Sequence, residues 1–334
     1  PDSVTRIWDF AFSGCTSLRK ITIPDSVTSI EELAFSGCSS LAEITIPDSV
    51  VHIGTLAFDG TPWLEAKQAE NPLVIVNHIL INGKACTGAV IIPDGVTSIG
   101  EDAFFNCSSL TEITIPNSVI SIEDYAFRSC SDLAKIIMPG NVTSIGEYSF
   151  ADCTSLTEIT IPDSVTSIGD NAFFGCSSLT KLTIPDSVTS IGNQVFLNCN
   201  SLTEITIPDS VTSIEEDAFS GCDNLTIYGN ADSCAQQYAT ENNIKFALIG
   251  TDPTVSKGDL DGNDTLDSTD IFYTMLYIAN VAVGNDGGLT AEQIAAADVD
   301  GNGTVDSTDS FYIMYYVALH GAGIHQTWEE VLTK

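Results

Sequence analysis

Hydrophobic positions repeat with a period of 23 residues along most of the chain. The repeating phrase is clearest in 161–183, IPDSVTSIGDNAFFGCSSLTKLT, and its Pro, Ile, Phe and Leu return at the same spacing. Phe, for example, stands at positions 12, 35, 58, 104, 127, 150, 173, 196 and 219. A unit this short cannot bury its own apolar face, whereas stacked units share one continuous core. The pattern therefore predicts a solenoid.

Each unit divides into three predicted pieces. LTEITIP has the alternation of a short parallel strand, SVTSI forms a second extended piece, and a helical turn at DNAFFGC closes the turn. Residues 61–92, TPWLEAKQAENPLVIVNHILINGKACTGAVII, break the period for one unit. We expect a hairpin excursion there.

The phrase IPDSVTSIG..AF..C, with the strand pattern LxxIxI, resembles the BspA-like leucine-rich repeats of bacterial surface proteins. The resemblance covers residues 1 to about 250 and implies a β-solenoid of parallel strands and short helical turns. It also implies that 225–246, LTIYGNADSCAQQYATENNIKF, closes the solenoid as a cap. The chain begins inside a repeat, so we expect a fragment or a processed form.

Eight of the ten cysteines share one column of the repeat. They stand at 15, 38, 107, 130, 153, 176, 199 and 222, and Cys86 and Cys234 lie outside the column. Ten cysteines in a secreted protein normally suggest disulfides. Neighbours in one column point the same way, however, and parallel Cβ vectors disfavour a bridge. We therefore expect a buried, reduced thiol column that packs as small hydrophobic side chains.

The exposed strand column before the middle Ile alternates in charge over its last turns, from Glu112 through Lys135, Glu158 and Lys181 to Glu204. Neighbouring strands bring such side chains to about 5 Å, so register-stabilising pairs are the favoured interpretation. A Thr column runs beside it. This flat Thr/Glu/Lys face could also bind a protein or a glycan, although it carries no aromatic platform.

The C-terminal part contains two matched acidic segments. Residues 259–279 and 298–318 carry the same residue at 14 of 21 positions without a gap. Each has oxygen donors at loop positions 1, 3, 5, 7, 9 and 12, the spacing with which an EF-hand loop wraps one calcium ion. The candidate ligands are Asp259, Asp261, Asn263, Thr265, Asp267 and Asp270 in the first loop, and Asp298, Asp300, Asn302, Thr304, Asp306 and Asp309 in the second.

The two loops differ at position 6, where the chain must turn sharply. The second loop has Gly303 and the first has Asp264. A hydroxyl follows each loop, and Ser268 and Ser307 are expected to cap the next helix. Those helices are apolar nearly all round, so one face is expected to stay exposed until a partner covers it.

Loop and helix, occurring twice from 258 to about 320, resemble a dockerin of the type I kind. That resemblance implies two Ca²⁺ ions and insertion into a cohesin of a cellulosome scaffoldin. The implied cohesin-contacting residues are Ser268, Thr269, Phe272, Met275, Leu276, Ser307, Thr308, Phe311, Met314 and Tyr315. We accordingly expect a solenoid with its cap over 1–250, a linker over 251–257 and a small α-helical dockerin domain over 258–334.

Charge and the scarcity of catalytic groups narrow the function further. The net charge of −34 argues against nucleic acid and anionic membranes as partners, and no apolar run is long enough to span a bilayer. The four histidines show neither a metalloprotease nor a Ser–His–Asp pattern, and no carboxylate pair is placed for glycoside hydrolysis. We therefore expect a non-catalytic binding protein. The dockerin resemblance further implies secretion to the cell-surface cellulosome of an anaerobic bacterium and a link to plant polysaccharide degradation. A surface-displayed adhesin and, less favoured, a polysaccharide-degrading enzyme are the alternatives.

Overall fold

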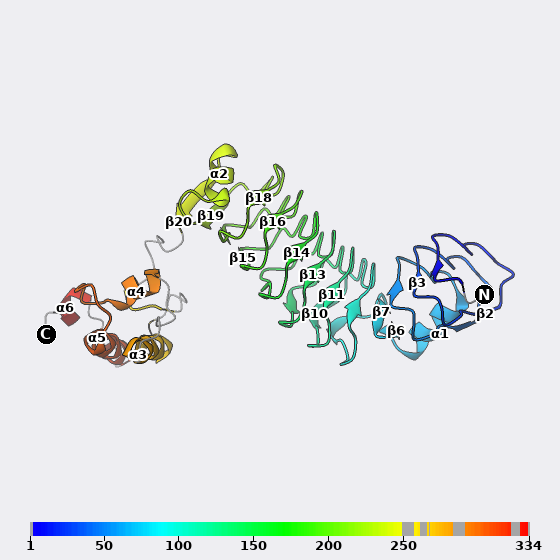
Figure 1. The fold of residues 1–334 in the computed structure, drawn as a ribbon, viewed down its shortest axis with the longest axis horizontal. Helices are drawn as coiled ribbons and strands as arrows, with labels where there is room; N and C mark the ends of the chain where they lie inside the picture. The colour runs from blue at the N-terminus through cyan, green and yellow to red at the C-terminus, as the bar shows by residue number, and fades with distance from the viewer. Residues whose placement is uncertain are drawn as a thin grey trace. The chain divides into compact units, whose positions relative to one another are not determined.

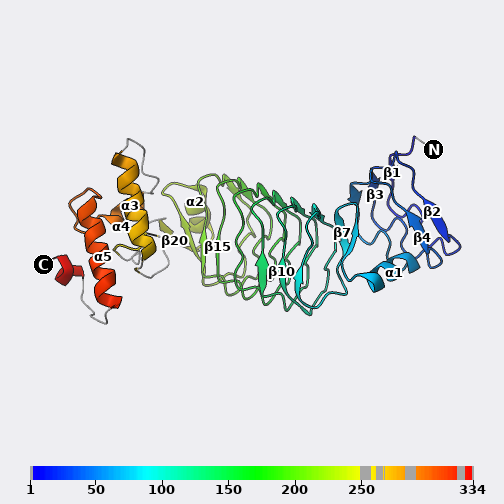
Figure 2. The same ribbon diagram turned by 90° about the horizontal axis from the view of Figure 1, so that it is seen from below.

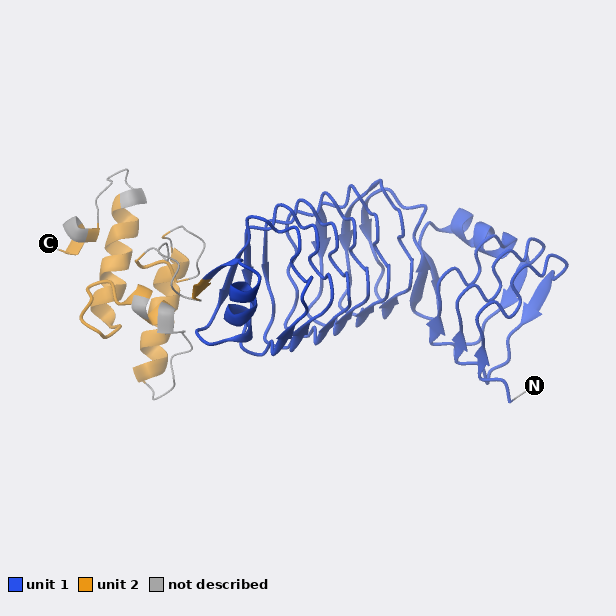
Figure 3. Cartoon of the chain, turned by 90° about the horizontal axis from the view of Figure 1, so that it is seen from above, with its two compact units in different colours: residues 1–246 blue, residues 247–334 orange. Residues whose placement is uncertain are grey.

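The computed structural model describes residues 3–248, 257–260, 266, 268–282, 291–321 and 328–332. The chain forms two compact units, Pro1–Phe246 and Ala247–Lys334 (Figure 3). Among the described residues, no helix combines the length and the apolar character needed to cross a bilayer.

The first unit is a parallel-strand solenoid of about 11 turns (Figures 1 and 2). The confirmed strand pieces lie on two faces. One face holds β2 (Lys20–Thr22), β4 (Glu43–Thr45), β8 (Gly88–Ile91), β10 (Leu110–Thr114), β12 (Lys135–Ile137), β15 (Lys181–Thr183), β17 (Glu204–Thr206) and β19 (Thr226–Gly229). The other holds β1 (Arg6–Ile7), β3 (Ser29–Ile30), β5 (His52–Ile53), β9 (Ser98–Ile99), β11 (Ser121–Ile122), β13 (Ser144–Ile145), β14 (Ser167–Ile168), β16 (Ser190–Ile191) and β18 (Ser213–Ile214).

The 23-residue period sets the register of both faces. Ser121 pairs with Ser144 and Ile122 with Ile145, so identical positions of successive turns lie side by side. The Phe column consequently stacks ring on ring inside the solenoid. Phe104 and Phe127 lie 5.0 Å apart between centroids, with an interplanar angle of 8°, and both are fully buried. Side-chain packing along the axis thus forms the core.

The closing segment differs from the predicted helical turn. In the turn around Phe127, the amide of Arg128 donates to the carbonyl of Tyr125 at 3.0 Å, a three-residue step. Tyr125 and Ser129 have φ of 58° and 59°, in the left-handed region, which interrupts a right-handed helix. The amide of Phe127 donates to Ser149 of the next turn at 2.7 Å. The segment is a pair of β-turns that bond to the neighbouring turn.

The excursion contains the predicted hairpin, because β6 (Val74–Val76) and β7 (Ile79–Asn82) pair antiparallel. A helix that the sequence analysis missed, α1 (Pro62–Glu70), precedes it. Thr61 caps this helix by accepting from the amide of Leu64, and Pro62 stands in its first turn, both common at helix starts. Trp63 and Leu64 are buried. Strand β7 then pairs parallel with β9, which restores the stack.

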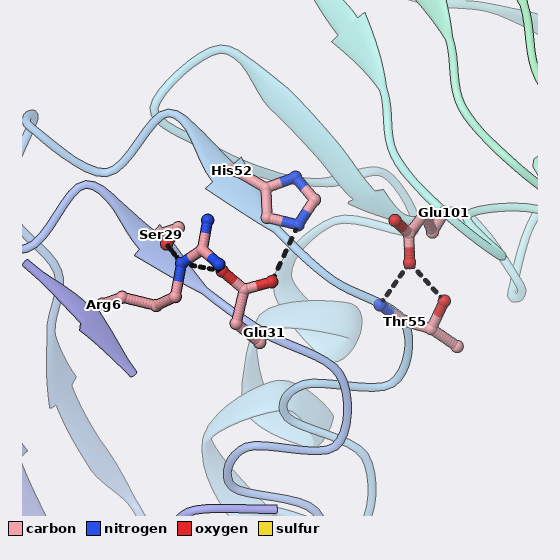
Figure 4. Close-up of polar contacts among 6 residues, drawn as sticks. All are labelled: Arg6, Ser29, Glu31, His52, Thr55 and Glu101. Carbon is pink, nitrogen blue, oxygen red and sulfur yellow. Dashed lines mark hydrogen bonds and ion pairs between the residues drawn. The ribbon is translucent and has the colours of Figure 1, made fainter. Parts of the chain in front are cut away.

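Polar side chains connect successive turns before the excursion, and one contact spans it (Figure 4). The Arg6 Nε lies 2.9 Å from a carboxylate oxygen of Glu31, whose other oxygen lies 3.5 Å from the Nε2 of His52. Further along the stack, the amide of Thr55 donates to Glu101 at 2.8 Å across a separation of 46 residues. Glu101 therefore joins the turns before and after the inserted unit.

The solenoid ends in a cap formed by α2 (Cys234–Glu241) and β20 (Lys245–Leu248), and β20 extends the sheet beside β19. Ser233 caps α2 by accepting from the amide of Gln236. The ring of Tyr238 meets Phe219, the last ring of the Phe column, edge to face at 5.8 Å. The cap therefore shields the apolar end of the stack, which would otherwise face water.

The second unit consists of α3 (Ser268–Ala282), α4 (Ala291–Ala297), α5 (Ser307–Gly321) and α6 (Trp328–Leu332). Its small core contains Leu260, Ala297, Val299 and Ile313. The ring of Trp328 stacks on Tyr316 at 4.4 Å, so the C-terminal segment packs back on α5.

Candidate calcium loops and docking surface

The carboxylates of the second acidic loop converge. Asp298, Asp300 and Asp309 each offer an oxygen, and these three oxygens lie within 4.8 Å of one another. Three like charges at this distance repel strongly unless a cation lies among them. The donors are all hard oxygens at EF-hand spacing, and this set fits Ca²⁺.

Backbone amides shape the second loop around these oxygens. The amide of Asn302 donates to Asp298 and to Asp300, both at 3.0 Å, and the amide of Gly303 donates to the second oxygen of Asp298 at 2.8 Å. Gly303 has φ of 86°, which a side chain would strain. Glycine at position 6 therefore permits the turn that brings Asp298 back toward the loop.

Asp309 closes the second loop from the first turn of α5. Its side chain is fully buried, and its oxygens accept from the amides of Asp300 at 3.3 Å and Asp306 at 2.9 Å. Burial raises the pKa of this carboxyl, and the backbone hydrogen bonds oppose the shift. A buried carboxylate of this kind needs a cation nearby, which supports its place in the ligand set.

The remaining candidates of the second loop have identifiable partners. Asn302 accepts from the amide of Thr304 at 2.8 Å. Asp306 accepts from the amide of Thr308 at 2.6 Å, and this hydrogen bond lowers the pKa of Asp306. Asp306 is thus the N-cap of α5, so the expectation that Ser307 caps the helix was wrong. Ser307 is the first helical residue because the chain enters the helix one position earlier.

Of the first loop, residues 259–260, 266 and 268–270 lie within the described residues. Asp259 and Asp270 are both buried, and the amide of Leu260 donates to Asp270 at 2.6 Å. Asp270 occupies the first turn of α3 as Asp309 does in α5. The other predicted ligands of this loop, Asp261, Asn263, Thr265 and Asp267, lie outside the described residues.

Helix α4 connects to the start of the first loop, a role that the sequence analysis did not foresee. The side-chain amide of Gln293 donates to the carbonyl of Leu260 at 2.8 Å. The amide of Gly258 donates to the carbonyl of Ala296 at 2.9 Å. These bonds fix the entry to the first loop against the segment that leads into the second.

Helices α3 and α5 expose matching apolar side chains. Phe272 and Phe311 are 59% and 52% exposed, and Met275 and Met314 are 58% and 49% exposed. On the opposite sides of the same helices Thr274 and Ile313 are fully buried. Each helix therefore packs through one face and presents the other to solvent.

The other predicted contact residues surround these side chains. Leu276, Ser268, Ser307 and Thr308 are exposed, and Thr269 is half-buried. The half-buried ring of Tyr315 stacks on Phe311 at 6.0 Å. Together with the four exposed Phe and Met side chains they form what we call the docking ridges, one on each helix.

On the repeats, the expected charge column forms ion pairs between neighbouring turns. Lys20 and Glu43 lie 2.6 Å apart, Glu112 and Lys135 lie 2.8 Å apart, and Lys181 and Glu204 lie 2.8 Å apart. All three pairs are solvent-exposed, so each contributes about 1 kcal/mol or less. They stabilise the register of the strands and leave few free charges on this face.

A solenoid of stacked turns joined to a small helical unit with paired acidic loops defines a modular repeat protein. The profile of the BspA type leucine rich repeat region matches in six copies, over 1–79, 83–200 and 143–237. The chain belongs to this family of leucine-rich repeat proteins. The profile of the dockerin type I domain matches residues 257–318, which confirms the resemblance of the second unit.

Several solved structures are similar to the solenoid. One is a leucine-rich repeat protein of T. pallidum, which is 22% identical, covers 73% of this chain and 79% of its own, and has a TM-score of 0.32. Another is the pneumococcal vaccine antigen PcpA, which is 19% identical, covers 69% of this chain and 68% of its own, and has a TM-score of 0.47. A leucine-rich cell surface protein of Faecalibacterium prausnitzii shows 27% identity, covering 76% of this chain and 79% of its own, with a TM-score of 0.32. No curated protein matches the chain.

The two families define the general role. Leucine-rich repeats and dockerins are non-catalytic modules, typical of extracellular or surface proteins. Type I dockerins bind calcium, and a dockerin implies a cohesin as partner. Together they support a cellulosome-type docking or adhesion role.

Proposed function

We propose that the chain is a non-catalytic cellulosomal protein that docks through its C-terminal unit and binds a ligand through its repeats. Two Ca²⁺ ions occupy the acidic loops, one held by the ligands predicted between Asp259 and Asp270 and the other by those between Asp298 and Asp309. The domain limits are 1–250 for the repeats and cap, 251–257 for the linker and 258–334 for the dockerin.

The observation that carries the docking function is the matched exposure of the two ridges. Phe272 and Met275 on α3, like Phe311 and Met314 on α5, expose roughly half or more of their surface. Exposed apolar side chains gathered on a small unit mark an interaction surface. A cohesin that covers one ridge removes these side chains from water and gains the corresponding hydrophobic free energy.

The setting follows from this partner. A protein that docks on a scaffoldin is secreted to the cell-surface cellulosome of an anaerobic bacterium, and its ligand belongs to plant polysaccharide degradation. Anaerobic surroundings also suit ten unpaired cysteines. The repeats then hold a protein or a glycan near the enzymes of the complex.

Biolayer interferometry against a panel of immobilised cohesins tests the docking function. We expect the full chain with 1 mM Ca²⁺ to bind at least one cohesin and to lose that binding in EGTA. Asp309→Asn should weaken binding, because it removes a buried carboxylate from a calcium loop. The proposed docking function is wrong if no type I cohesin binds in calcium, or if EGTA leaves binding unchanged.

A surface-displayed adhesin is a second candidate, favoured by one observation on the repeats. Ile91 and Ile137 flank Thr114 in the strand register and are 75% and 43% exposed. Two exposed isoleucines on the turns either side of Thr114 favour contact with a protein surface. Adhesion of cells displaying the chain, with an Ile91→Ser and Ile137→Ser variant as control, distinguishes this candidate from cohesin docking.

A further inference from the structure

Aromatic and basic side chains gather on the turn face of the repeats, away from the charge column. Tyr125 and Tyr148 occupy the same position of successive turns and stack at 5.2 Å with an interplanar angle of 6°. Phe105 and Arg128 occupy another shared position, three residues later. We call these four residues, with Lys84, the aromatic–basic patch.

The two cations of the patch lie against its rings. The guanidinium carbon of Arg128 lies 5.2 Å from the ring centroid of Tyr148, 5.5 Å from that of Tyr125 and 6.0 Å from that of Phe105. The Lys84 ammonium lies 5.6 Å from the centroid of Phe105. Phe105 is 37% exposed, so its ring with a cation near it is accessible from solvent.

Neither cation forms an ion pair with a described residue. Other cations of the repeats, Arg6, Lys20, Lys67, Lys135 and Lys181, form ion pairs. Among the residues that the structure describes, no carboxylate lies within 4.0 Å of Lys84 or Arg128. In a chain of net charge −34, two unpaired cations on one patch provide donors that a ligand carboxylate can satisfy.

The surroundings limit the charge of that ligand. Asp102 interacts electrostatically with both Lys84 and Arg128 at longer range, and burial raises the pKa of its carboxyl. This acid and the acidic surface as a whole repel a densely charged polymer. The rings offer apolar contact, while Asp102 and the two cations offer both acceptors and donors. Such a mixture fits the ring C–H groups and hydroxyls of a sugar that carries a single carboxylate.

We propose that the aromatic–basic patch binds a glycan with isolated uronic acid side groups, the carboxylate meeting Arg128 and Lys84 and a sugar ring lying against Phe105. The inference rests on the proposed function, because it specifies the ligand class of the repeats.

Isothermal titration calorimetry of the full chain in Ca²⁺ tests it with three probes. They are a xylotriose bearing one 4-O-methylglucuronic acid, unsubstituted xylotetraose and a short Glu-containing peptide. We expect the substituted oligosaccharide to bind at least tenfold more tightly than either other probe. Arg128→Ala and Phe105→Ala should each weaken its binding at least tenfold.

Arg19→Ala is the matched control, because Arg19 is an exposed arginine of the repeats with no ion pair among the described residues. It makes the same charge change and should leave affinity within twofold. Circular dichroism of each variant verifies the fold. The inference is overturned if the substituted oligosaccharide does not bind, if xylotetraose or the peptide binds equally well, or if folded Arg128→Ala binds normally. Cohesin binding in the same samples reports separately on the docking function.

Discussion

At the scale of single residues, the cysteine column shows how a repeated position acquires uniform chemistry. Cys153 is fully buried, and its thiol donates to the carbonyl of Phe127 at 3.2 Å. The same bond recurs from Cys176 to Phe150. All ten cysteines are free, and Cys15 of the outermost turn is exposed. The buried thiols pack as small side chains. Seven thiols each donate one hydrogen bond to a backbone carbonyl, those of Cys38, Cys107, Cys130, Cys153, Cys176, Cys199 and Cys222.

Burial of these thiols predicts that the solenoid loses stability in alkali. Burial raises the pKa of Cys153 to about 12, whereas a thiol in the unfolded chain has a pKa of about 8.5. The unfolded state therefore loses its proton first, and the stabilisation present below pH ~8.5 declines as pH rises toward 12. Each such thiol contributes a slope of about 1.4 kcal/mol per pH unit within this range.

Urea unfolding of the reduced protein at several pH values between 8 and 11 measures this slope. Cys153→Ala should be less stable at pH 8 yet show a shallower decline above pH 9. Cys15→Ala, which removes an exposed thiol, should keep the slope of the original protein. Equal slopes for all three proteins would contradict the assignment.

Two residues at equivalent loops give a second residue-scale prediction. Asp298 belongs to the carboxylate cluster and accepts hydrogen bonds from the amides of Asn302 and Gly303. Asp298→Ala should therefore lower the calcium affinity at least tenfold. Asp264→Gly places in the first loop the residue that Gly303 supplies at the aligned position of the second. It should keep or improve affinity, because glycine adopts the left-handed conformation without strain. Calorimetric titration of each variant with Ca²⁺ measures both. Greater loss from Asp264→Gly would reverse this ranking.

At the scale of elements, the near-identity of α3 and α5 predicts two modes of cohesin binding. Met275 and Met314 occupy equivalent positions and are similarly exposed. If a local two-fold relates the copies, half a turn of the unit presents an equivalent ridge. The copies differ at Leu276/Tyr315 and at Ile271/Ser310. A bias of about 1.4 kcal/mol between the two modes would make one preferred tenfold.

Paired charge substitutions test the two modes. Ser268→Asp with Met275→Asp disables one ridge, and Ser307→Asp with Met314→Asp disables the other. Each pair alone should keep most of the cohesin affinity, and the two pairs together should eliminate it. Loss of all binding from one pair, with no effect of the other, would show that only one ridge is used.

At the scale of the whole molecule, the two units have cores of very different size. The repeats bury a continuous column of Phe, Ile, Leu and Cys, whereas the fully buried apolar side chains described in the second unit are few. Clustered carboxylates in that unit repel one another without a cation. Calcium binding therefore supplies part of its folding free energy.

Chelation should unfold the second unit selectively. Thermal denaturation of the full chain in Ca²⁺ and in EGTA, followed by helical circular dichroism, measures this. In EGTA we expect loss of most of the helical signal. The melting temperature of the repeats should stay within a few degrees of its value in Ca²⁺. The β-rich repeats contribute little helix, since α1 and α2 are short. An unchanged spectrum in EGTA would contradict a metal-dependent fold.

Periodicity and loop spacing determined much of this protein from sequence alone. A 23-residue repeat forces identical positions into contact, so the strands, the Phe stack, the thiol column and the Lys–Glu pairs could be predicted. The duplicated ligand spacing likewise indicated two calcium loops. All ligands of such a loop come from 12 consecutive residues, so their spacing can be recognised without knowing the tertiary structure. The same spacing places Tyr125 beside Tyr148 and Phe105 beside Arg128 in the patch.

Tertiary structure alone decided two kinds of feature. One depends on the interruption of the 23-residue period, and the other on which of several hydrogen-bonding groups a backbone amide pairs with. The inserted unit, with α1 and β7, sets which residues meet around it, so Lys84 lies near Phe105 and Glu101 bonds to Thr55 across the insert. In the closing segments, bonds to the next turn and left-handed residues replace the predicted helical turn. Asp306 rather than Ser307 caps α5 because the loop geometry sets where the helix begins. Local spacing could not reveal these outcomes, since each depends on a backbone path set by distant contacts.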